Sequence, residues 1–284
     1  MTMPSPAQAA LDFTIGGGMG EAIGMLGPVA LACALYAAGW WRLRRRPGAQ
    51  NEAAILPALV FGAGIALLVL ATWGPLHDYG QWSLAAHMGQ HMLLMALVPP
   101  LLLAGRPGAV IAGALPDAIA RRWHGTLARL HERLAMALTP AAALQVAVMW
   151  FWHHPAAITA TLYDARLHAL MHVSFLLSGL WLWMALLRRI RDPQSGVVAA
   201  LVVIVAMMMQ MGLLGALLTF SGRLLYPVCS ARAAARGLDP MGDQQLAGLI
   251  MWVPACLPYL IGGLWLLHRG FRHIGRRDGV EPGS

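Results

Sequence analysis

Two pairs of histidines, each spaced four residues apart, lie inside long apolar runs of the chain. The first pair is His87 and His91, and the second is His168 and His172. Residues four apart project from the same face of a helix, and a histidine within a bilayer is energetically costly. Because neutral imidazole is a frequent ligand of zinc and copper, this spacing indicates a metal site shared between two helices.

The composition is that of an integral membrane protein. The 284 residues are 58% hydrophobic and only 11% charged, with a mean hydropathy of +0.62. Soluble domains carry about 25% charged residues. Several apolar runs approach or exceed the roughly 20 residues that cross a hydrocarbon core. We therefore expect an all-α, polytopic fold that is surrounded by membrane lipid and has no large soluble domain.

Seven transmembrane helices are expected from these runs. They cover residues 22–41, 55–74, 84–104, 138–153, 167–187, 196–220 and 244–267. The chain then divides into an outer N-terminal tail (1–21), a membrane domain (22–268) and a cytoplasmic basic tail (269–284). The N-terminal tail lacks the basic start of a cleavable signal, so the first helix is expected to be retained. The segment 117–135 can form a basic amphipathic helix on the cytoplasmic surface.

The arginines set the expected orientation. Of the 20 basic residues, none is a lysine, and sixteen fall on one side of the helices: Arg42, Arg44, Arg45, Arg46, Arg106, Arg121, Arg122, Arg129, Arg133, Arg188, Arg189, Arg191, Arg269, Arg272, Arg276 and Arg277. Four fall on the other: Arg166, Arg223, Arg232 and Arg236. Cytoplasmic loops are rich in arginine, so the N-terminus is expected outside and the C-terminus in the cytoplasm. The arginines that set this orientation also account for the net charge of +8, so nucleic acid is not expected as a partner.

In this orientation both histidine pairs lie near the outer face at matching depths. The helices that carry them both enter from outside, so the two pairs could surround one ion. Asp164 lies four residues before His168, where it could accept a hydrogen bond from a ligating imidazole. Further candidate ligands lie toward the same side: His77, His153, His154, Met88, Met92 and Met95. Asp243 and Gln244 are, with Asp164, candidates for groups that orient the ligands.

Thioether sulfur suits Cu(I), but methionine is also a common apolar filler. The part played by the methionine run at 207–211 and by Cys229, in an outer connection, is therefore left open. The three cysteines form no CxxC pair, and a disulfide framework is not expected.

Three stretches of the chain resemble the CtaG family of cytochrome c oxidase assembly factors. They are HMGQHMLLMALVPPLLLAG (87–105), WFWHHPAAITATLYDARLHALMH (150–172) and DQQLAGLIMWVP (243–254). The resemblance extends over roughly residues 20–268. It implies a seven-helix protein of the bacterial plasma (inner) membrane that is linked to copper delivery to the oxidase.

Carried onto this chain, the resemblance matches His87 and His91 to the family's first membrane histidines, and His168 and His172 to its second pair. His153 matches the histidine of a Trp-His-x-Pro pattern, although here a second histidine directly precedes the proline. Met171 stands where the family often has an acidic residue. The function expected is therefore non-enzymatic: copper, as Cu(I) or Cu(II), is held for a haem–copper oxidase subunit and received from an outer-face donor. A homo-oligomer is compatible with this function.

Three other functions stay open on the sequence alone. Two histidines on facing helices can ligate a b-type haem. Three histidines with a bound water and a carboxylate base would make a zinc-dependent membrane hydrolase. A proton or metal transporter needs a polar path to the cytoplasm, and the helices become apolar beyond Met95 and Ser178.

Overall fold

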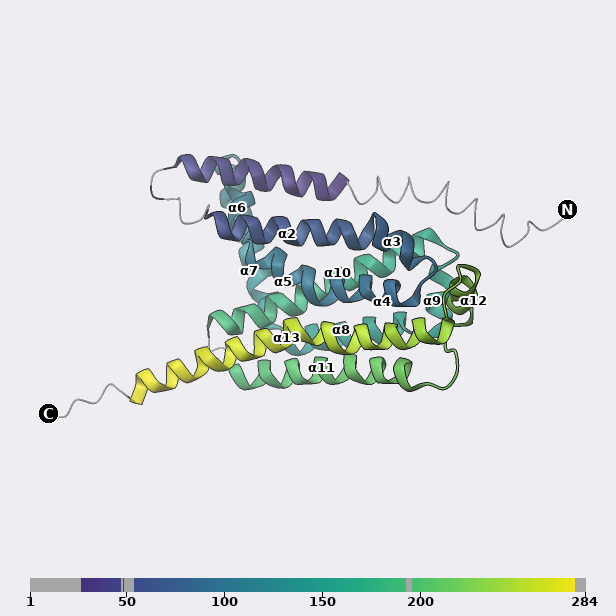
Figure 1. Ribbon diagram of the computed structural model, residues 1–284. Helices are drawn as coiled ribbons and strands as arrows, with labels where there is room; N and C mark the ends of the chain where they lie inside the picture. Colours follow the sequence, from purple (N-terminus) through teal and green to yellow (C-terminus); the bar gives the residue numbers. More distant parts are fainter. Residues whose placement is uncertain (1–26, 47, 49–53, 193–195, 279–284) are drawn as a thin grey trace.

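The computed structural model describes residues 27–46, 48, 54–192 and 196–278. These residues are helical, with no strand among them, and the long helices run side by side (Figure 1). The expected all-α class is confirmed. The tail at 1–21, the start of the first expected helix and the last six residues lie outside the described residues.

A first helix covers residues 27–45. The others, in chain order, are α2 (Ile55–Thr72), α3 (Pro75–Gly80), α4 (Leu84–Met92), η1 (Leu93–Leu97), α5 (Val98–Ala104), α6 (Pro107–Ala114), α7 (Asp117–Met136), α8 (Leu138–Trp152), α9 (Pro155–Thr161), α10 (Ala165–Arg191), α11 (Val197–Phe220), α12 (Pro227–Ala235) and α13 (Pro240–Asp278).

Within the described chain, five helices are long and apolar enough to cross a membrane. They are Ile55–Gly80, Leu84–Ala104, Ala165–Arg191, Val197–Phe220 and Pro240–Arg272. A sixth span arises if the bent pair Ala128–Met136 and Leu138–Trp152 is taken as one. The expected amphipathic segment 117–135 is helical as α7.

The Leu84–Ala104 span is continuous, but its middle, η1, is a π-helix. Pro99 and Pro100 follow closely, and proline has no N–H to donate to the carbonyl four residues earlier. The carbonyls of Met95 and Ala96 therefore lose their ordinary helical partners, and the wider π register accommodates the break. Gly179 of α10 lies against the Met95 carbonyl at this point, where a side chain would be too close.

The α7–α8 junction bends by 76°, which opens carbonyl groups at the end of α7. Arg189 of α10, only 6% exposed, donates to the carbonyls of Ala135 and Met136 at 2.9 and 3.0 Å. The guanidinium thus satisfies buried acceptors that the bend would leave without partners.

The two ends of the bundle differ in structure (Figure 1). The short helices α3, α9 and α12 gather at the end where α4, α10 and α13 begin, whereas α6 and α7 lie at the opposite end. These short helices were not expected from the sequence, because each is too brief for a hydrophobic period to identify. They place the segments 75–83, 154–166 and 221–243 together.

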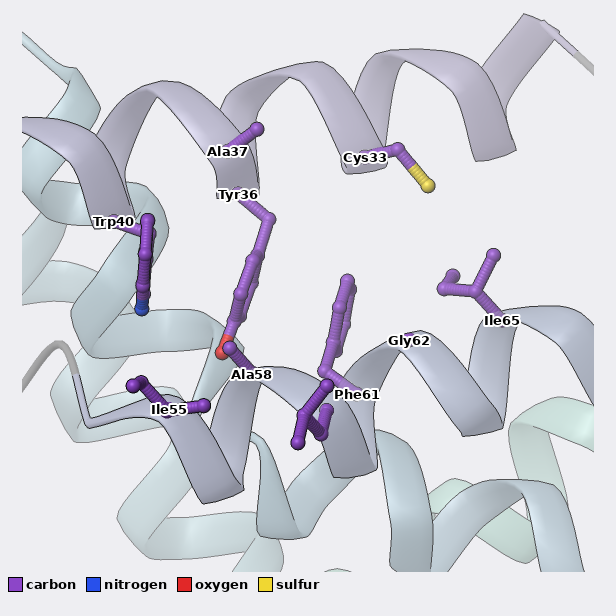
Figure 2. A pocket seen from close by; sticks show the side chains of 10 residues that line it. Cys33, Tyr36, Ala37, Trp40, Ile55, Ala58, Phe61, Gly62 and Ile65 are labelled. Carbon is purple, nitrogen blue, oxygen red and sulfur yellow. The ribbon is translucent and has the colours of Figure 1, made fainter.

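The first helix packs on α2 at the edge of the bundle. The rings of Tyr36 and Phe61 stack with centroids 4.0 Å apart, and the Tyr36 hydroxyl donates to the Gly105 carbonyl at 2.8 Å. Beside them lies an almost wholly apolar pocket of about 480 Å³ that Cys33 also lines (Figure 2). Its lining residues come from the first helix and from α2, and the ribbon view places the first helix on the far side of α2 from α4 and α10 (Figure 1).

Candidate metal centre

Helices α4 and α10 bring the two histidine pairs into one cluster. The ring centroids within each pair lie 4.5 Å apart for His87 and His91 and 4.3 Å apart for His168 and His172. Across the two helices, His87 lies 5.7 Å from His168, and His91 lies 6.4 Å from His172. The sequence-based expectation that the pairs share one depth therefore holds in the geometry.

The four imidazoles are almost completely buried. His87 is 2% exposed, His91 0%, and His168 and His172 3% each. The Nε2 atom of every one of the four has no hydrogen-bond partner. An unpaired buried polar atom costs about 1–3 kcal/mol, so four such atoms in one cluster are expensive unless another group binds them.

Two further histidines flank the four. The His77 ring, partly exposed on α3, lies 5.4 Å from His168 and 6.3 Å from His172. The His153 ring, at the end of α8, lies 5.2 Å from His91. His154 is exposed instead, as the residue before α9.

Sequence reasoning missed two neighbours of the cluster. Phe175 is fully buried, and its ring lies 4.5 Å from His91. Gln90 is also fully buried and donates to the Ala71 carbonyl at 2.7 Å. Each follows a cluster histidine, His172 or His87, by three residues, so helical spacing could have identified both.

The methionines proposed as ligands lie in the hydrophobic core around the cluster. Met88 and Met95 are 0% exposed and Met92 is 6% exposed. Of the methionine run at 207–211, Met207 and Met211 are buried, whereas Met209 is 67% exposed. The run therefore points around α11, as expected for a continuous series.

The donor set suits a transition metal, but the rings are not closed around a point. In the part of the chain that the structure describes, no three histidine, cysteine or acidic side chains are arranged to hold a metal ion as they stand. Neutral imidazoles bind copper and zinc well. The rings would therefore have to come closer together before they could surround one ion.

Asp243 acts at the start of the helix that carries the first pair. Its carboxylate accepts from the Ser83 hydroxyl at 2.7 Å and from the Leu84 amide at 2.6 Å. The Ser83 hydroxyl in turn accepts from the Ala86 amide at 3.2 Å. Helix α4 is thus capped by its own serine and by a carboxylate from α13, which fixes the turn where His87 stands.

Asp164 caps the start of α10 in the same way. It accepts from the amides of Arg166 and Leu167 at 2.8 and 3.2 Å. This oxygen therefore caps the helix that carries the second pair. The orienting contact with His168 that the sequence suggested stays a prediction.

Gln244 ties down the connection between α11 and α12. Its side-chain oxygen accepts from the Leu225 amide at 2.7 Å, and its nitrogen donates to the Arg223 carbonyl at 3.1 Å. Nearby, Arg232 of α12 donates to the carbonyls of Gln81 and Leu162, both at 3.1 Å. Helix α12 is therefore fastened across the starts of α4 and α10.

Cys229 lies in α12 and is 6% exposed. Burial raises the pKa of its thiol to about 12. Since the thiolate is the metal-binding form, a thiol protonated at neutral pH is a poor ligand.

These features define a helical membrane protein with a buried histidine cluster at one end of the bundle. Residues 34–273 match the family model of the cytochrome c oxidase caa3 assembly factor, Caa3_CtaG. The chain belongs to this family of oxidase assembly factors, as the three sequence stretches suggested. Neither a curated protein nor a solved structure matches the chain.

Replacing Asp243 tests whether the carboxylate from α13 holds the first turn of α4. Asp243→Ala should lower the free energy of unfolding by about 1–2 kcal/mol, as loss of a helix cap does. Amide exchange should accelerate at Leu84 and Ala85, whereas Asp243→Asn, which retains an acceptor, should lie between. Asp164→Ala removes a carboxylate cap from α10 instead, so it serves as the matched control and should leave exchange at Leu84 and Ala85 at the parental rate. Equal exchange in the parent and Asp243→Ala would contradict this role.

Proposed function

We propose that this protein holds copper near the outer membrane face and passes it to a haem–copper oxidase while that enzyme is assembled. The observation that carries the proposal is the set of four buried Nε2 atoms without hydrogen-bond partners. Membership of an oxidase assembly family supplies the receiving enzyme class. The direct ligands proposed are His87, His91, His168 and His172.

A neutral imidazole shell suits cargo that must leave again. Removing a cation from four imidazoles leaves no uncompensated anionic ligand in the low-dielectric core, unlike removal from thiolates or carboxylates. Imidazole accepts copper in either oxidation state, so the proposal covers both Cu(I) and Cu(II). The His77 ring is partly exposed, so an ion that enters the cluster from outside would contact this ring first.

The carboxylate contacts favour this function over a zinc hydrolase. A hydrolase needs a free carboxylate base beside the bound water. The two candidates, Asp164 and Asp243, both accept hydrogen bonds from backbone amides at helix starts. A capping carboxylate of this kind is poorly placed to receive a proton from water in the cluster.

The membrane arrangement proposed has seven spans, with the first at residues 22–41, in a bacterial plasma membrane. The end of the bundle that carries α3, α9 and α12 would face outward (Figure 1). The arginine-rich ends of α10 and α13 would then face the cytoplasm, in accordance with positive-inside bias.

Substitution of the four histidines tests copper binding directly. The variant with His87→Ala, His91→Ala, His168→Ala and His172→Ala should lose bound copper, and single His→Gln variants should bind more weakly. Exposed histidines provide the controls His131→Ala and His268→Ala. Metal content, chelator competition and an optical spectrum for haem are measured on folded protein in detergent; parental copper content in the quadruple variant would defeat the assignment.

Orientation is tested by labelling single cysteines in a chain from which Cys33, Cys229 and Cys256 have been removed. Tyr79→Cys and Tyr163→Cys, both at exposed positions, should react with an impermeant reagent added outside intact cells. His131→Cys, at the opposite end, should react only after the membrane is opened. The reverse pattern would invert the proposed topology.

A deletion strain tests the cellular role. Oxidase subunits should still be made and inserted, but the enzyme should contain less copper and show little activity, because the ion is not delivered. Complementation with the parent should restore both, and with the quadruple histidine variant neither. Normal copper content and activity in every haem–copper oxidase of the deletion strain would rule the function out.

A further inference from the structure

His153 makes a chain of contacts that leads from a backbone carbonyl to the histidine cluster. Its Nδ1 lies 2.6 Å from the carbonyl oxygen of Met149, and its Nε2 lies 3.5 Å from Nδ1 of His91. The side chain is 4% exposed. It is therefore held between a fixed acceptor and a buried ring, away from water.

A carbonyl oxygen can only accept, so the proton of neutral His153 must lie on Nδ1. Its Nε2 then carries a lone pair, which can only accept a proton from its neighbour. The neighbour is Nδ1 of His91, so the proton of His91 must also lie on Nδ1. This leaves the Nε2 of His91, which has no other partner, as a lone pair inside the cluster.

We infer that His153 is a positioning residue that fixes the tautomer of His91 and leaves the His91 Nε2 ready to bind the metal. Both ring nitrogens of His153 already have hydrogen-bond partners, so neither is free to bind the metal. This assigns His153 a role different from the direct ligation considered from the sequence. The copper part of the inference rests on the proposed function, but the tautomer does not.

The surroundings fix His153 at the backbone as well as the ring. The hydroxyl of Tyr226 donates to the His153 carbonyl at 2.7 Å, and the His153 amide donates to Met149 at 3.2 Å. Burial also raises the pKa of the Tyr226 hydroxyl, which keeps it a donor. His153 thus makes four polar contacts, two through its ring and two through its backbone, in a buried position where each polar group needs a partner.

Metal-free protein provides the decisive test. Nitrogen-15 NMR of labelled histidine rings distinguishes the two neutral tautomers, and the His91 signals can be assigned from a His91→Gln variant. We expect the Nδ1–H tautomer for His91 in the parent. His153→Leu should release it into a mixture, whereas His153→Gln should preserve it, because an amide can donate to Met149 and accept from His91.

Copper-loaded protein provides a second readout. In His153→Leu, copper affinity should fall about 10- to 100-fold, as for other outer-shell partners. The number of coordinated nitrogens, measured by X-ray absorption, should equal that of the parent. The neighbouring, exposed His154 supplies the matched control as His154→Gln, which should change neither quantity.

Two results would overturn the inference: an Nε2–H tautomer for His91 in the parent, or the loss of one coordinated nitrogen in His153→Leu. If His153→Leu fails to fold, the parent spectrum and His153→Gln still decide the tautomer. If the parent binds no copper, the proposed function fails, but the NMR result continues to test the contact chain.

Discussion

Four imidazoles with unpaired nitrogens share a site from which water is largely excluded, and much of the bundle is organised around that arrangement. The ring nitrogens stay without hydrogen-bond partners only if other groups hold the helices, and therefore the rings, in place. Gln90 fastens α4 to α2 through the Ala71 carbonyl. Phe175 closes the inner side of the cluster with an apolar ring against His91.

Both histidine-bearing helices begin close to the cluster, and this has an electrostatic consequence. A helix N-terminus carries about half a positive charge, which disfavours a cation nearby. Asp243 and Asp164 place a carboxylate at the start of α4 and α10 respectively. Their negative charges offset the positive ends of the two helices while the carboxylates remain hydrogen-bonded to the backbone. The electrostatic field in the cluster thus becomes more favourable for a cation, although no acidic side chain binds it.

The sequence predicted the helical class and five of the seven expected spans closely, because apolar length is a local property of the chain. The expected helix at 84–104 coincides with the observed span, and the pairing of His87 with His168 followed from depth alone. The capping of α4 by Asp243 joins residues about 160 positions apart, and no local pattern carries that information. The predicted span at 138–153 is the helix α8 of only 15 residues, because the chain bends sharply before it.

The role of His153 was also beyond the sequence. As the histidine that follows Trp152, it was a candidate ligand, because the sequence shows only the residue type and its neighbours in the chain. Only the positions of Met149 and His91 show that both ring nitrogens are already engaged. Short helices such as α12 escaped prediction because they are too brief for a hydrophobic period to identify, and the contacts that Arg232 makes across the fold leave no trace in the local sequence.

The π-helical turn at Leu93–Leu97 separates two parts of one membrane span. In a regular helix each residue advances the chain by about 100° around the helix axis. An inserted residue would therefore rotate everything that follows it, but a π-helical turn accommodates the extra residue without that rotation. The face that presents His87 and His91 and the face of α5 that packs on α2 therefore keep the angular relation that they would have in a regular helix. Removing one residue from the turn would leave both faces in place but would restore the regular helical register, in which the rings of Pro99 and Pro100 clash with the carbonyls one turn before them.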